Sequence, residues 1–173
     1  MSLLPIGLVQ AFEGESENAS PRIQPSLRYL LLTCWKGVDE ALDRFGLPAD
    51  PKHRGQIRQL LVEQIQKQID DDDDGDQSLM RLLCAQLFSI GNVEDALIIW
   101  QAKSCNFDTM LGIDVQLLCG AGLSETKMFF SSIDSEEARE AMRYIEDCEK
   151  SGDFDRFPIE RGLPEYRRFY GLG

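Results

Sequence analysis

The chain has 173 residues, of which 43% are hydrophobic and 28% charged, and 30 acidic against 18 basic residues give a formal net charge of −12. This composition is typical of a folded globular domain and excludes a disordered or fibrous chain. A field of this sign repels phosphates and anionic lipid, so we expect neither nucleic acid nor a membrane surface among the partners.

The cysteines and the single histidine argue against a disulfide framework and a metal centre. The cysteines are odd in number, widely spaced and never in a Cys-x-x-Cys pair: Cys34, Cys84, Cys105, Cys119 and Cys148. This pattern indicates a reducing compartment, and we expect a cytoplasmic protein. His53 lies between two basic residues, and we interpret it as an exposed polar residue near a helix start. We therefore predict no metal, no cofactor and no catalytic residue.

The N-terminal residues are apolar but do not resemble a targeting or membrane segment. They lack a basic flank, are interrupted by Pro5 and Gly7, and run into glutamates. No apolar stretch reaches the length of about 18 residues that a bilayer requires. We predict a flexible arm over residues 1–24, a helical domain over 25–152, and a C-terminal tail over 153–173 that packs on the body as an extended segment.

Between the arm and the middle of the chain, apolar residues recur at helical spacing. The sequence predicts helices over residues 26–45, with a break near Gly37, and over 56–69, 78–90 and 93–103. In the second of these, one stripe is expected to be buried: Ile57, Leu60, Leu61, Ile65, Gln68 and Ile69. We also expect Trp35 and Trp100 in the core.

Residues 108–133 permit two interpretations. The favoured one has a helix that Asp108 caps and that runs through Leu118, and a second that Ser124 caps and that runs through Ser131. The alternative is a strand over Ile113–Leu117 that leads into a glycine turn, but no second strong strand is available to pair with it. The segment from Asp134 to Gly152 predicts a capped helix whose stripe is Ala138, Ala141, Met142, Ile145 and Cys148. The predicted fold is all-α, with antiparallel helical hairpins packed as a small bundle or a short α-solenoid.

The most conspicuous motif is the acidic loop of residues 70–76. On the EF-hand frame, Asp70, Asp72 and Asp74 fall on ligand positions and Gly75 on the turn position. The closing position holds Arg81, a cation that opposes calcium binding. We therefore interpret the loop as a solvated acidic surface suited to a basic partner.

The glycines at positions 120 and 122 only begin a phosphate-binding pattern. The third glycine of a dinucleotide fingerprint is replaced by Glu125, and Thr126 and Met128 flank Lys127 where a P-loop has other residues. A turn between two helices explains these glycines better.

Aromatic and arginine residues alternate in the tail, which has four acidic and four basic residues and thus no net charge. Its Arg167-Arg168 pair could meet an acidic partner. Candidate partner-binding residues are therefore Asp70, Asp71, Asp72, Asp73, Asp74, Asp76, Arg167 and Arg168.

Residues 79–102 resemble a tetratricopeptide-type helical repeat. With Gly91 as the turn between two helices, Leu83, Cys84 and Leu87 fall on packing positions of the first helix. Ala96 and Trp100 then match the small and the large residue of the second helix. Lys103 and Asp108 depart from the pattern. The resemblance implies stacked helical hairpins and no particular partner.

These features favour a noncatalytic protein–protein interaction module with an acidic surface suited to a basic partner. One alternative is a ligand-binding protein or enzyme that uses residues 113–127, with Asp114 or Glu125 as acid or base. Another is an immunity-type inhibitor of a basic toxin. The sequence leaves the oligomeric state open.

Overall fold

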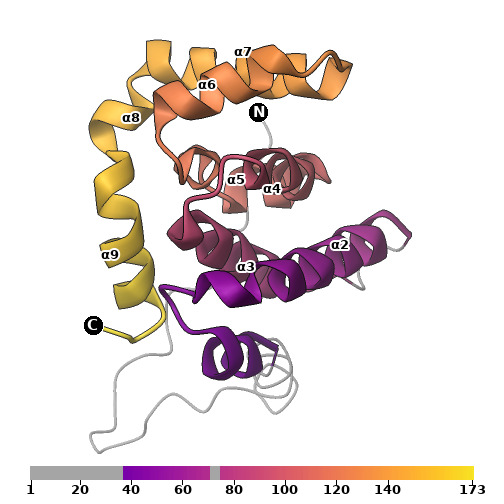
Figure 1. Ribbon diagram of the computed structural model, residues 1–173, viewed down its shortest axis with the longest axis vertical. Coiled ribbons are helices and arrows are strands. Elements are labelled where there is room, and N and C mark those ends of the chain that lie inside the picture. Colours follow the sequence, from indigo (N-terminus) through magenta and orange to yellow (C-terminus); the bar gives the residue numbers. More distant parts are fainter. Residues whose placement is uncertain (1–36, 71–74) are drawn as a thin grey trace, which may run out of the picture.

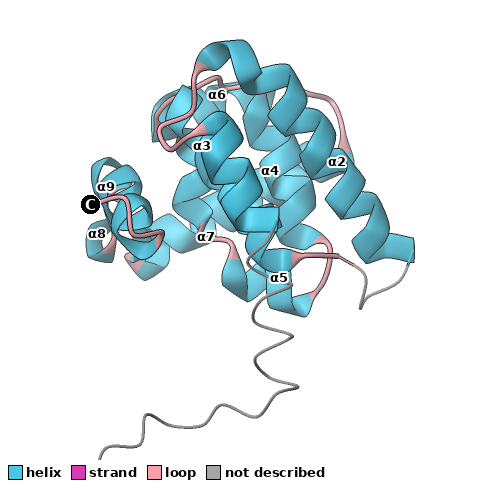
Figure 2. Cartoon of the chain, turned by 90° about the horizontal axis from the view of Figure 1, so that it is seen from below, coloured by secondary structure: helices cyan, strands magenta, loops and turns pink. Residues whose placement is uncertain are grey.

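The computed structural model describes residues 37–70 and 75–173, where every regular element is helical and no strand occurs (Figures 1 and 2). The predicted all-α fold is confirmed. The predicted arm of residues 1–24, Trp35, Cys34 and Asp71–Asp74 lie outside the described residues.

The described elements follow one another with short connections. In chain order they are the helix of residues 37–45, η1 (Pro51–His53), α2 (Arg54–Asp70), α3 (Gln77–Ile90), α4 (Asp95–Ser104), α5 (Phe107–Gly112), η2 (Val115–Cys119), α6 (Leu123–Ser132), α7 (Glu136–Ser151), α8 (Asp153–Arg156) and α9 (Ile159–Phe169). Because so few residues join successive helices, neighbours fold back on one another as hairpins. None of these helices is both long and apolar enough to cross a bilayer.

The helices form layers along the long axis of the molecule (Figure 1). The helix of residues 37–45 lies at one end, α2 with α3 and α4 with α5 follow, and α6 and α7 cover the other end. From there α8 and α9 return along the side of the layers and contact η2 and α3. The C-terminal helix thus ties the layers together.

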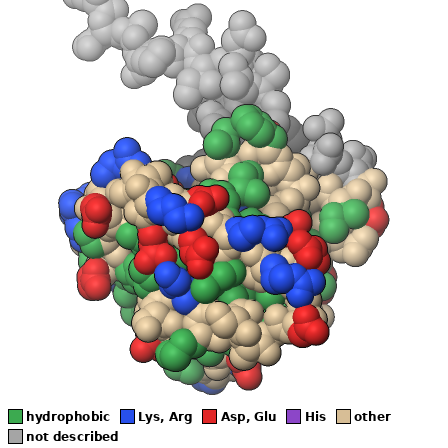
Figure 3. Space-filling model, turned by 90° about the horizontal axis from the view of Figure 1, so that it is seen from above, with side chains coloured by type: hydrophobic (Ala, Val, Ile, Leu, Met, Phe, Trp, Pro, Cys, Tyr) green, Lys and Arg blue, Asp and Glu red, His purple; other side chains and the backbone are tan. Residues whose placement is uncertain are grey.

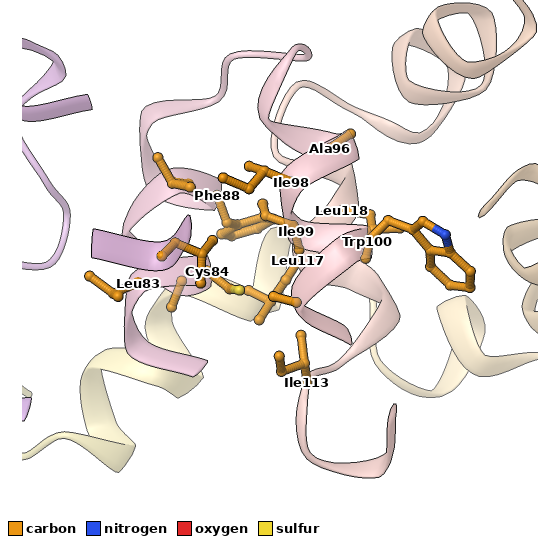
Figure 4. Packing of buried hydrophobic residues seen from close by; sticks show 14 of the residues in the cluster. Leu83, Cys84, Phe88, Ala96, Ile98, Ile99, Trp100, Ile113, Leu117 and Leu118 are labelled. Atoms are coloured by element: carbon orange, nitrogen blue, oxygen red, sulfur yellow. The ribbon is translucent and has the colours of Figure 1, made fainter. Parts of the chain in front are cut away.

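The core is centred on α3, which is buried around most of its circumference. Residue 80 and residues 82–88 are all buried, as the nearly continuous apolar sequence of this helix predicts. Side chains of α3 face those of α4 and η2 in one cluster, with Cys84 close to Leu117 (Figure 4). Trp100 points to the other side of α4, where its ring lies 5.4 Å from that of Tyr144 on α7. The prediction that Trp100 is a core residue is confirmed.

The hairpin of α3 and α4 turns at a glycine. Gly91 has φ of +74° and ends α3, a conformation that glycine adopts without steric cost. Ala96 and Trp100 are both buried. The tetratricopeptide-type repeat itself stays a prediction.

Several predicted boundaries between residues 107 and 132 were wrong. The first helix, α5, begins one residue before Asp108, because Asn106 and Thr109 form a capping box, and it ends at Gly112. The strand interpretation of Ile113–Leu117 was also wrong, because η2 occupies most of this segment. Gly122, not Ser124, precedes the first residue of α6.

The tail of residues 153–173 was predicted to be extended and is helical instead. Pro158 stands just before α9, where its missing N–H costs nothing. Pro164 lies inside α9, yet the helix continues because Gly162 and Tyr166 are buried one turn apart on its inner side. Burial against α3 and η2 outweighs the hydrogen bond that Pro164 cannot make.

Candidate functional site

The acidic segment of residues 37–45 lies beside the start of α3, where Asp76 stands. A side-chain carbon placed on Gly37 would lie 3.5 Å from Asp76 Oδ2 and 3.4 Å from Leu79, so residue 37 lies beside the start of α3. The stretch from residue 37 to residue 76 holds 11 acidic and five basic residues. We call the described acids Asp39, Glu40, Asp43, Asp70 and Asp76 the acidic end.

The predicted acidic residues that the structure describes have different local roles. Asp76 caps α3, because its carboxylate accepts a hydrogen bond of 3.0 Å from the Leu79 N–H. Asp70 is exposed at the C-terminal end of α2, where Gln66 Nε2 donates to it over 2.8 Å. Four of the predicted residues, Asp71–Asp74, lie outside the described residues.

The two arginines of the predicted pair are both engaged within the fold. Arg167 donates to the carbonyl oxygens of Leu47 and Leu172, which fastens α9 to the loop before η1. Arg168 is exposed and forms an ion pair of 2.6 Å with Glu165. Arg167 therefore already serves the fold.

Beside the acidic end, α2 exposes two large apolar side chains. Val62 is 51% exposed and Ile69 is 65% exposed. The prediction that Ile69 belongs to the buried stripe was wrong, because Gln64 and Gln68 take inward positions. Gln64 is held there by a hydrogen bond of 3.1 Å from the Asp76 N–H. The inward glutamines leave Ile69 on the outer side of the helix.

The opposite end of the molecule has a different surface. Two grooves lie beside α6, one along its length from Leu123 and one at its C-terminal end, and both include Ser131 and Ser132. Figure 3 shows this face, where positive and negative side chains are interspersed with hydrophobic ones. The cations are paired locally, as in the Lys127–Glu149 bridge of 2.7 Å and the Arg139–Asp134 bridge of 2.9 Å. Such a face has no strong preference for one sign of charge.

Residues 113–127, the segment that the enzyme alternative would use, are held in place by contacts within the fold. Tyr166 donates its hydroxyl proton to Asp114, and burial raises the pKa of Tyr166 well above its usual value. A side-chain carbon on Gly120 would lie 2.6 Å from the Phe88 carbonyl oxygen, so this glycine permits a close main-chain approach. Glu125 is exposed on the first turn of α6. Both the glycine and the aspartate thus have structural partners.

Lys103 is a buried cation that the sequence did not single out as a structural residue. Only 2% of it is exposed, and its Nζ donates to the carbonyl oxygen of Ile113 over 2.6 Å and to that of Met110. Its Nζ also lies 5.0 Å from the centre of the Tyr144 ring. Burial lowers the pKa of Lys103. Because Met110 and Ile113 are at the end of α5, the ammonium caps carbonyl groups that the helix leaves unpaired.

The four described cysteines carry free thiols, of which Cys84 and Cys119 are fully buried. Burial raises the pKa of Cys119 to about 12 and also raises that of Cys84. These two thiols stay protonated at pH 8, and we expect a maleimide reagent to leave them unmodified in the folded protein while it labels them in urea. Peptide mass spectrometry after timed labelling measures this. Modification of Cys119 in the native state at the rate of a free thiol would contradict its burial.

His53 and the acidic residues that the structure describes show no grouping that suggests a metal. His53 is half-buried, with its ring 5.4 Å from that of Phe45, so its predicted exposure is only partial. Among residues 37–70 and 75–173, no three His, Cys, Asp or Glu side chains are grouped so that they could hold a metal ion. Comparisons with protein-family models, curated proteins and solved structures gave no match for this chain.

Proposed function

We propose that this protein is a noncatalytic interaction module whose acidic end binds a basic protein partner. The observation that carries the proposal is the proximity of Gly37 to Asp76, since it brings the segment of residues 37–45, which holds Asp39, Glu40 and Asp43, next to Asp76 at the start of α3. Concentrated charge of one sign raises the association rate with an oppositely charged partner.

The position of Asp70 supports the proposal on energetic grounds. The C-terminal end of a helix carries a partial negative charge, and a carboxylate there is destabilising. Only Lys67 places a positive charge in the last turn of α2. Local sequence choices that oppose stability are typical of functional sites, because the stability that they sacrifice is regained on binding.

This cost can be measured in the isolated protein. We expect Asp70→Asn to raise the free energy of unfolding by about 0.5 kcal/mol at low salt, because it removes a negative charge from the negative end of α2. The gain should shrink as added salt screens the charge. Urea titration at two salt concentrations gives the difference. An unchanged or lower stability at low salt would show that Asp70 carries no such cost.

The function is tested by comparing two variants that remove the same charge. Asp39→Asn/Asp43→Asn/Asp70→Asn neutralises the acidic end, while Asp134→Asn/Glu140→Gln/Asp147→Asn neutralises exposed acids near and on α7. The full chain and both variants are immobilised and exposed to native lysate, with a wash at about 0.5 M salt. We expect the full chain and the α7 control to retain a basic protein that the acidic-end variant does not, and the salt wash to release it.

Other results separate the remaining functions. Equal retention by both variants, or recovery of only a small metabolite, would contradict the proposal. If the captured protein is a basic enzyme that loses activity in the complex, the proposed interaction module is an inhibitor of that enzyme.

A further inference from the structure

The outer side of α2 repeats with the period of a coiled coil. A glutamine, an exposed aliphatic residue and an acid recur seven residues apart. The two sets are Gln59, Val62 and Glu63, then Gln66, Ile69 and Asp70. Residues seven apart on a helix differ in direction by only about 20°, so both aliphatic side chains lie along one line.

Hydrogen bonds repeat with the same period. Gln59 Nε2 donates to Glu63 Oε1 over 3.1 Å, and Gln66 Nε2 donates to Asp70 Oδ1 over 2.8 Å. Each carboxylate is thereby held next to the glutamine one turn before it. The apolar line of Val62 and Ile69 is consequently bordered by two fixed negative charges on one flank.

From this geometry we infer that α2 binds a basic amphipathic helix, which lies alongside it. The inference rests on the proposed function and names the structure of the partner. A seven-residue repeat keeps an apolar line facing a second helix, whose own apolar residues pack against it. The 17 residues of α2 give a surface about 25 Å long. Lysine or arginine on the partner would pair with Glu63 and Asp70.

The charges favour such a partner over a second copy of this chain. Two α2 helices packed side by side would bring four carboxylates around the same apolar line, with Lys67 as the one cation in the last turn of each. Like charges across a helix pair are destabilising, whereas opposite charges determine which partner is chosen.

The test uses a synthetic peptide of about three heptads, with leucine at a and d and lysine at e and g. The control is a peptide of the same composition, an isomer in which the order of residues is changed, so that its leucines are spread around the helix. Calorimetric titration into the full chain should show the patterned peptide binding at least about tenfold more tightly than the isomer. Equal affinity for the two peptides would overturn the inference.

Three variants locate the site. Val62→Ser/Ile69→Ser should weaken the patterned peptide about tenfold, while Phe107→Ser/Leu111→Ser on α5, which removes two comparably exposed side chains, should have no effect. Glu63→Gln/Asp70→Asn should weaken both peptides and reduce the salt dependence. If the acid variant alone weakens binding, the helical partner is wrong and the acidic module stands. If no variant weakens binding, the inference is wrong. Sedimentation of the full chain must also show a monomer, because dimerisation lost in Val62→Ser/Ile69→Ser would assign the face to a second copy.

Discussion

Gly120→Ala should lower the free energy of unfolding by about 3 kcal/mol. The new methyl group would lie 2.6 Å from the carbonyl oxygen of Phe88 and 3.0 Å from its Cα, and main-chain atoms cannot rotate away as a side chain can. Gly120 also contacts the turn between α3 and α4, since a carbon on Gly91 would lie 3.2 Å from its carbonyl oxygen. The substitution therefore strains the main chain at the centre of the fold.

Gly55→Ala is the matched control for this prediction. Gly55 is in α2, and a carbon at this position would meet nothing within 4 Å. Alanine there should raise the free energy of unfolding by about 0.5 kcal/mol, because it restricts the unfolded chain and favours the helix. If the packing is as described, urea unfolding should show a lower free energy of unfolding for Gly120→Ala and a higher one for Gly55→Ala. A Gly120→Ala protein as stable as the parent would show that η2 and α3 do not approach so closely.

Asp95→Asn should cost about 2 kcal/mol of stability, because it discharges the buried carboxylate that joins α2 to α4. The Asp95 side chain is only 2% exposed and accepts two hydrogen bonds of 2.9 Å from Arg54, and Arg58 donates to it as well. Arg54 is 25% exposed, so water recovers part of the loss. The asparagine side chain accepts hydrogen bonds only at its carbonyl oxygen. Its NH2 group, which is a donor, would face the donor groups of the two arginines.

The control for Asp95 is its neighbour. Glu94 is 67% exposed and bonds the same Arg54 over 3.0 Å, yet Glu94→Gln should change the free energy of unfolding by less than about 0.5 kcal/mol. Both stabilities are compared as urea midpoints with unchanged slope. If Asp95→Asn and Glu94→Gln had equal effects, the ion pair between Arg54 and Asp95 would be no stronger than one on the surface.

Helices with a clean apolar stripe were predictable from the sequence. In α7, Ser135 caps the first turn and Ala138, Ala141, Ile145 and Cys148 are buried, as the spacing indicated. The pattern succeeds here because each apolar residue on the inner face has no polar competitor. The alternating aromatic and arginine residues of the tail were interpreted as an extended segment on the body, whereas the contacts of α9 with α3 and η2 favour a helix.

The candidate site was predictable in part. The acidic loop was visible as a charge run, but the proximity of Asp76 to Gly37 depends on tertiary packing. The helical spacing placed both Gln68 and Ile69 in the buried stripe; Gln68 is buried as predicted, but Ile69 is exposed and Gln64 takes an inward position that the spacing of apolar residues did not indicate. The seven-residue repeat of glutamine, aliphatic and acid on α2 was the signal that could have revealed the exposed face. Lys103 could not be recognised as buried, since its carbonyl partners are fixed by the end of α5.

The most direct measurement maps the amide chemical shifts of the ¹⁵N-labelled full chain during titration with the leucine–lysine peptide. Binding along α2, with Asp70 of the acidic end taking part, predicts that the perturbed amides belong to residues 59–70, with the grooves beside α6 unaffected. Perturbations confined to α5 or to the face of α6 and α7, with α2 unchanged, would contradict it.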